Sequence, residues 1–137
     1  MSFKFLESGV TSDLELEVTA RSLKDFYKSI CLAVSDAMVD IKTINQKMCK
    51  RITVAGVNTK DLFFNIVEEL IYLKDAEQLV FADYKIISSS AKGVVIDCCG
   101  EKLNSRMVLR HDLKAPTLHN LSVLHNEKWI GHMVIDL

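Results

Sequence analysis

Two aspartates near the ends of the chain are the side chains best placed to bind a metal ion. Asp13 begins a predicted strand, and Asp136 is the penultimate residue, followed by Leu137, whose terminal carboxylate could join them if the chain ends there. Oxygen-only ligands of this kind suit Ca²⁺, Mg²⁺ or Mn²⁺. The groups would converge if the first and last strands are neighbours. Composition alone favours the simpler interpretation, in which Asp13 ends a turn and Asp136 is a solvated terminal charge.

The chain carries none of the usual local signatures of an enzyme. Its sequence contains no G-x-S-x-G, no P-loop, no G-x-G-x-x-G and no H-E-x-x-H zinc-protease pair. A catalytic site without a local motif would have to draw on His119, Lys114 and the two aspartates. Such an enzyme is therefore the weakest of the functions considered below.

Cysteine spacing predicts neither a disulfide framework nor a zinc site. The four cysteines form no C-x-x-C pair and do not stand at zinc-like spacing from a histidine. Cys98 and Cys99 are adjacent, so that in a strand their side chains would point to opposite faces. We expect four reduced, mostly buried thiols, at Cys31, Cys49, Cys98 and Cys99.

Length, charge and hydropathy limit the classes of protein to which the chain can belong. The 137 residues fit a single domain, residues 1–137, and are enough to bury a core. The net charge of −1 leaves no excess of Lys and Arg to neutralise phosphates, so direct tight binding of nucleic acid is not expected. No segment reads as a signal peptide or approaches the ~20 apolar residues of a transmembrane helix. We therefore expect a cytoplasmic protein that does not associate with membranes.

Hydrophobic periodicity predicts two helices and about seven strands. In residues 13–20, Leu14, Leu16 and Val18 alternate with polar residues, which is typical of a strand with one buried face. The capping pattern S-x-x-D at Ser22 predicts the start of a helix that ends near residue 40. A second, more buried helix is expected to be capped at its start by Asn58 or Thr59. The remaining expected strands are 3–7, 48–55, 79–87, 94–99, 118–124 and 129–136, the last two forming a hairpin.

This order of elements predicts an α+β domain, with two helices packed on one face of a mainly antiparallel sheet. Pro116 is the one proline of the chain. Because proline cannot donate a ladder hydrogen bond, we expect it at the edge of the sheet or at the first residue of a strand.

Short motifs along the whole chain resemble those of the archease family. The helix start at 20–26, A-R-S-L-K-D-F, is similar to the family's G-x-S/T-L-E-E-x-F. Segment 69–73, E-L-I-Y-L, is similar to E-L-L-Y-L. Other similar segments are 9–13 to D-H-T-A-D, 38–40 to M-T-D, 61–63 to D-L-L, 100–101 to G-E, 114–119 to K-A-V/I-T-Y-H and 134–137 to V-I-L-D-I. These segments follow the order of the family from end to end.

The resemblance implies a metal site, a partner and an archease-like α+β fold. The metal site, expected to hold Ca²⁺ or alternatively Mg²⁺ or Mn²⁺, would be built from Asp13 and Asp136, with Leu137. The partner would be the RNA-splicing ligase that joins tRNA halves, which archease helps to become guanylylated and to turn over. Modulation of a tRNA methyltransferase is also attributed to the family. The residues that match its motifs and are candidates for partner contacts are Thr11, Lys114, Thr117 and His119.

Two departures from the family pattern bear on this metal site. The family's first Asp and His in D-H-T-A-D are Gly9 and Val10 here. Neither supplies a side-chain ligand, and cation affinity falls as charged ligands are removed. Two hypotheses follow: a non-enzymatic activator of the ligase, or a chaperone-like, protein-binding module that keeps the archease scaffold without activating the ligase. Modulation of a tRNA methyltransferase belongs to the second.

Overall fold

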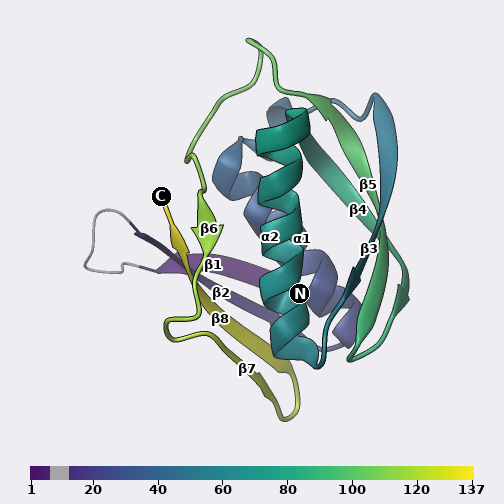
Figure 1. Ribbon diagram of the computed structural model, residues 1–137, viewed down its shortest axis with the longest axis vertical. Helices are drawn as coiled ribbons and strands as arrows, with labels where there is room; N and C mark the ends of the chain where they lie inside the picture. Colours follow the sequence, from purple (N-terminus) through teal and green to yellow (C-terminus); the bar gives the residue numbers. More distant parts are fainter. Residues whose placement is uncertain (7–12) are drawn as a thin grey trace.

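The computed structural model describes residues 1–6 and 13–137, which form two antiparallel sheets and two long helices (Figure 1). The α+β class, with two helices and antiparallel strands, is confirmed. The elements are β1 (Ser2–Leu6), β2 (Asp13–Ala20), α1 (Leu23–Met38), the 3₁₀ helix η1 (Ile41–Thr43), β3 (Met48–Ala55), α2 (Thr59–Glu77), β4 (Leu79–Ser89), β5 (Gly93–Lys102), β6 (Ala115–Pro116), β7 (Ser122–His125) and β8 (Trp129–Asp136).

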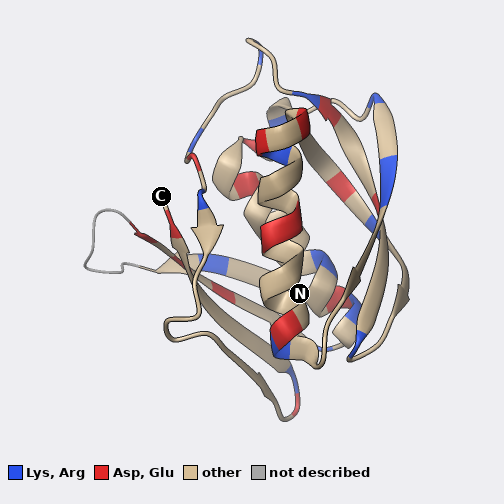
Figure 2. Ribbon diagram, viewed as in Figure 1, with Lys and Arg blue, Asp and Glu red and all other residues tan. Residues whose placement is uncertain are grey.

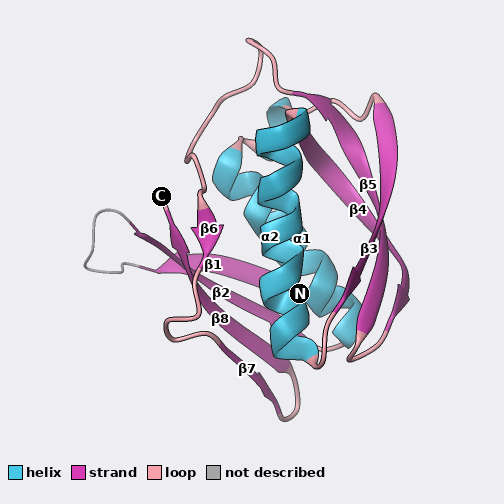
Figure 3. Ribbon diagram, in the orientation of Figure 1, coloured by secondary structure: helices cyan, strands magenta, loops and turns pink. Residues whose placement is uncertain are grey.

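The strands are divided between two sheets, whereas the sequence pattern suggested one. The first sheet has the order β1-β2-β8-β6, and β7 also pairs with β8. The second has the order β3-β5-β4. Figure 3 shows the helices between the two sheets, and α1 contacts both β2 of the first sheet and β4 of the second. The alternation within each strand could not reveal this division, because both sheets bury one face against the helices.

Both helices begin at the side-chain caps that the sequence indicated. Ser22 Oγ accepts a hydrogen bond from the Asp25 N–H at 3.1 Å, and Asn58 Oδ1 accepts one from the Asp61 N–H at 2.8 Å. α2 ends at Gln78, whose φ of 55° is left-handed and turns the chain into β4. No helix in the described part of the chain is long and apolar enough to span a membrane.

The last third of the chain departs from the expected strands. The predicted strand 118–124 is shortened to β7, and a two-residue strand that was not expected, β6, precedes it with a turn between them. Pro116 lies in β6, which pairs with β8 alone and so forms an edge of the first sheet. The expected edge position of Pro116 is therefore confirmed. The hairpin of β7 and β8 around residues 126–128 is also present.

The expectation of four reduced cysteines was wrong for two of them. Cys49 of β3 lies directly opposite Cys99 of β5, and the two form a disulfide. Cys31 and Cys98 are free and buried. The expected opposite orientation of Cys98 and Cys99 is present, since Cys98 faces the core. The disulfide could not be read from spacing, because the two residues are 50 positions apart and meet only through the β3–β5 register.

Gly131 of β8 allows the two helices to reach the first sheet. The rings of Phe26 from α1 and Phe63 from α2 meet edge to face, with centroids 5.9 Å apart. A Cβ at position 131 would lie 2.7 Å from Phe26 Cζ and 2.8 Å from Phe63 Cε2. Both rings are fully buried and have no free space to move into.

We therefore expect Gly131→Ala to lower the free energy of unfolding by about 1–3 kcal/mol, the usual cost of overpacking a core. Gly93→Ala is the matched control, because a Cβ there would meet only Val54 O, at 3.8 Å. Urea denaturation of both variants measures the difference. Equal stability of the two variants would show that the packing of the rings on β8 is not tight.

Candidate functional site

Asp13 and Asp136 lie directly opposite each other on the neighbouring strands β2 and β8. The strand that Asp13 begins is therefore the neighbour of the last strand, which was the condition for the carboxylates to converge. Opposite residues of an antiparallel pair project to the same face, with Cβ atoms ~4.5–5.5 Å apart. Figure 1 shows the C-terminus beside the beginning of β2. The fold brings the carboxylates together, and their role as metal ligands stays a prediction.

The aspartate pair is open to solvent on one side. Asp136 is exposed and Asp13 is half-buried. Like charges placed directly opposite destabilise a strand pair, and a cation between them would remove that cost. Within residues 1–6 and 13–137, no three His, Cys, Asp or Glu side chains gather as a metal cluster. Among these side-chain types, the pair therefore offers two carboxylates and no third ligand in the described part of the chain.

The same face of the first sheet carries further acidic side chains along β2. Glu15 and Glu17 follow Asp13 at every second position, and Figure 2 shows acidic residues along β2 and at the end of β8. Glu15 Oε1 lies 3.3 Å from His132 Nε2, and Glu17 Oε1 lies 3.6 Å from Lys4 Nζ. These two glutamates thus have basic neighbours from the adjoining strands.

Two of the four partner-contact candidates lie beside the end of β8. The Lys114 N–H donates to Asp136 O at 2.9 Å. Thr117 donates to Val134 O from both its N–H, at 3.0 Å, and its Oγ1, at 2.8 Å. His119 lies in the turn between β6 and β7, with its Nε2 3.3 Å from Asn120 Nδ2. Thr11 falls outside the described residues.

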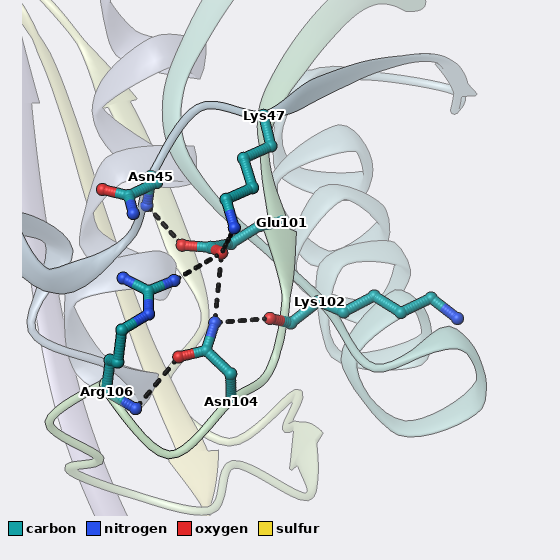
Figure 4. A network of polar contacts seen from close by, with 6 residues as sticks. All are labelled: Asn45, Lys47, Glu101, Lys102, Asn104 and Arg106. Atoms are coloured by element: carbon teal, nitrogen blue, oxygen red, sulfur yellow. Dashed lines mark hydrogen bonds and ion pairs between the residues drawn. The ribbon is translucent and has the colours of Figure 1, made fainter.

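A buried carboxylate, Glu101 at the end of β5, organises the segment that leads to Lys114 (Figure 4). Its Oε2 accepts a hydrogen bond from the Asn45 N–H at 2.6 Å. Its Oε1 accepts from Asn104 Nδ2 at 3.1 Å and Arg106 Nη2 at 3.0 Å, and lies 3.6 Å from Lys47 Nζ. The Asn45 hydrogen bond, with the charges of Arg106 and Lys47, holds the pKa of Glu101 below its usual range.

Lys74 of α2 holds the other end of the same segment. Its amine is nearly buried and donates to Asp112 Oδ1 at 2.7 Å and to Leu113 O at 3.0 Å, and it lies 2.9 Å from Asp75 Oδ1. Burial alone would lower the pKa of Lys74, but the hydrogen bonds to Asp112 and Asp75 outweigh it and raise that pKa. Residues 103–113 are thus anchored at both ends, immediately before Lys114.

Sequence reasoning missed Glu101 and Lys74 as organising residues. Their partners lie up to 56 positions away in the chain, so the sequence could not show which groups they hold. The available signals were weak: Glu101 belongs to the short G-E match in a segment expected to be a loop, and Lys74 is a basic residue on an otherwise apolar side of a helix. A charge on a buried face is expected to have an internal partner, but the sequence does not name it.

Comparison with known proteins agrees with the motif resemblance. Residues 3–137 match the model of the Archease protein family (MTH1598/TM1083). The archeases of Thermococcus kodakarensis and Pyrococcus furiosus are each 29% identical over 133 residues, covering 93% of this chain and 94% of theirs.

Two solved structures are similar in fold. The solution structure of Methanobacterium thermoautotrophicum protein 1598 has a TM-score of 0.82 at 20% identity, with 98% of each chain covered. The crystal structure of a Thermotoga maritima archease, described as a possible chaperone, has a TM-score of 0.58 at 18% identity, with 93% of each chain covered.

The lowered pKa of Glu101 predicts a pH-dependent contribution to stability. A carboxyl whose pKa is lower in the folded protein stabilises it above the unfolded pKa, ~4.3 for Glu, and loses this contribution as the pH falls through the folded value. We expect Glu101→Gln to reduce the free energy of unfolding near neutral pH, and the deficit to shrink in acid. Urea denaturation across this range measures it, with the exposed Glu68→Gln as control. A deficit that does not change with pH would contradict this interpretation.

Proposed function

The chain belongs to the archease family, and we propose that it is a non-enzymatic accessory protein that activates an RNA-splicing ligase. It promotes guanylylation of the ligase and its repeated turnover in tRNA splicing in the cytoplasm. A divalent cation held at the Asp13–Asp136 pair takes part in this action. The observation that carries the proposal is the register that sets these two family-matching aspartates opposite each other.

The chemistry of the aspartate pair fits a hard cation. Its donors are carboxylate oxygens, with main-chain oxygens of Leu137 adjacent in sequence, and such ligand sets suit Ca²⁺, Mg²⁺ or Mn²⁺. The exposure of Asp136 leaves coordination positions open to water or to a partner's ligand. A cation at this edge would supply a positive centre that a nucleotide phosphate or a ligase carboxylate can share.

The net charge of the chain supports a complex in which the ligase, and not this protein, binds the RNA. With a net charge of −1, the protein has no general affinity for the RNA backbone, so the ligase would hold the RNA. The acidic end of the first sheet would dock beside the nucleotide pocket of the ligase. There the two carboxylates, set opposite each other by the β2–β8 register, would help to arrange GTP and its metal ion.

A second candidate function, a chaperone-like protein-binding module, is favoured by a different region. A hollow of about 420 Å³ lies between the start of α2 and the turn at 118–121. Val57 and Leu118, which line it, are 75% and 74% exposed. Exposed apolar side chains around a hollow are typical of protein-binding surfaces. A tRNA methyltransferase is among the clients that this alternative includes.

An assay of ligase guanylylation separates the two functions. We expect wild-type protein to stimulate the reaction, and Asp13→Asn and Asp136→Asn each to reduce the stimulation by about tenfold or more, since losing a metal ligand costs at least what losing its supporting contacts does. Glu17→Gln is the matched control, because Glu17 lies on the same strand and face but not opposite Asp136.

No stimulation by the wild type, under conditions in which an archease with the full D-H-T-A-D motif stimulates, would sink the ligase proposal. Full activity of both Asp variants would instead show that ligase activation does not depend on the aspartate pair. Urea denaturation of all variants verifies that any loss of activity is not loss of fold.

A further inference from the structure

The Cys49–Cys99 disulfide lies on the outer face of the second sheet, far in sequence from the aspartate pair. Cys49 belongs to the edge strand β3 and is exposed, whereas Cys99 belongs to the central strand β5 and is half-buried. The inner face of the same two strands is packed against the helices, where Cys98 is fully buried. A solvent-facing disulfide on a strand edge differs from the buried disulfides that only staple a fold.

The surroundings of the two sulfurs favour attack at Cys49. A thiolate attacks a disulfide in line with the S–S bond, so attack at Cys49 comes from the open side of β3, where no strand pairs. Attack at Cys99 would come from the side of β4, where Asp83 is its register partner. The Asp83 carboxylate is half-exposed and repels an approaching thiolate, and Lys28, at 3.8 Å, neutralises it only in part.

The other two thiols do not compete. Burial raises the pKa of Cys98 to about 12 and holds the pKa of Cys31 well above its usual range. Both therefore remain protonated, and thiols in that form do not attack disulfides. Exchange chemistry at this face is confined to one pair of sulfurs.

We propose that Cys49–Cys99 is a redox-active site that exchanges reversibly with dithiol reductants, and this proposal does not rest on the ligase-activating function. One thiolate of the reductant attacks Cys49 Sγ, forms a mixed disulfide and releases Cys99 as a thiolate, which takes up a proton. The second thiol of the reductant, deprotonated, then displaces Cys49. The protein disulfide gains two electrons and two protons, and the dithiol loses the same number to become a cyclic or intramolecular disulfide.

Reduction of the disulfide also affects the neighbouring segments, because hydrogen bonds join them next to the two cysteines. The Lys47 N–H donates to Gly100 O at 3.0 Å, and the Asn45 N–H donates to Glu101, so the strand ends beside the disulfide also hold the Glu101 network. Opening the bond removes a covalent link between the segments at 45–49 and 99–101. The site thereby controls how firmly residues 103–113 are held.

The experiment compares the full-length protein purified without reductant with the same protein treated with dithiothreitol, without denaturant in either case. Alkylation and intact mass should find no reactive thiol before treatment and two afterwards, at Cys49 and Cys99. Hydrogen exchange should become at least about tenfold faster at residues 45–47 and 100–106 after reduction. The double variant Cys49→Ser/Cys99→Ser should exchange like the reduced protein and should not respond to dithiothreitol.

Single variants test the direction of attack. With an aromatic disulfide reagent, the thiol of Cys99→Ser, which keeps Cys49, should react at least about tenfold faster than the thiol of Cys49→Ser, which keeps Cys99. Equal rates would overturn the assignment of Cys49 as the attacked sulfur. Four thiols in the untreated, denatured protein after exposure to air, a disulfide reducible only in denaturant, or unchanged hydrogen exchange after reduction would each overturn the proposal.

Discussion

The pairing of β2 with β8 joins the second strand of the chain to the last one. The core and the candidate site both depend on the register of this pair. On the inner face, Leu14 and Leu16 lie opposite Ile135 and Met133, and all four are buried. On the outer face, the same register sets Asp13 opposite Asp136. A shift of one residue would turn the apolar set to solvent and the acidic set to the core. The burial of the core thus fixes the geometry of the carboxylates.

The segment between β5 and β6 connects the two sheets and is held by polar contacts as well as by the buried side chains of Met107 and Leu113. Glu101 holds its start through hydrogen bonds and ion pairs, and Lys74 holds its end at Asp112. Arg110 adds ion pairs to Asp36 and Asp40, at 3.0 and 3.7 Å. This segment leads to Lys114, whose N–H donates to Asp136 O of β8. The position of the candidate site therefore also depends on the charges of Glu101 and Lys74, which lie outside it. Exposed ion pairs contribute little to stability, so the buried ends of Glu101 and Lys74 carry most of this effect.

Local features of the sequence predicted most of the helices and strands. Alternation from Asp13 to Ala20, the caps at Ser22 and Asn58, and the edge position of Pro116 all rest on interactions within a few residues, and all are confirmed. The division into two sheets, the Cys49–Cys99 pair and the partners of Glu101 arise from contacts between distant segments. Neither spacing nor composition encodes those pairings, and only the register of the assembled strands produces them. The sequence predicted that Asp13 and Asp136 would converge only if their strands were neighbours, which the β2–β8 register fulfils. Thr11, another candidate, lies outside the described residues.

We propose that the pairing of β2 with β8 builds a cation site from Asp13 and Asp136. The most direct test is a crystal structure of the protein soaked in Mn²⁺, with the ion located by its anomalous scattering. We expect an anomalous peak between the two carboxylates, with the ion about 2.1–2.5 Å from their oxygen atoms. A well-ordered pair of aspartates without such a peak, at a Mn²⁺ concentration that saturates an archease with the full motif, would contradict it.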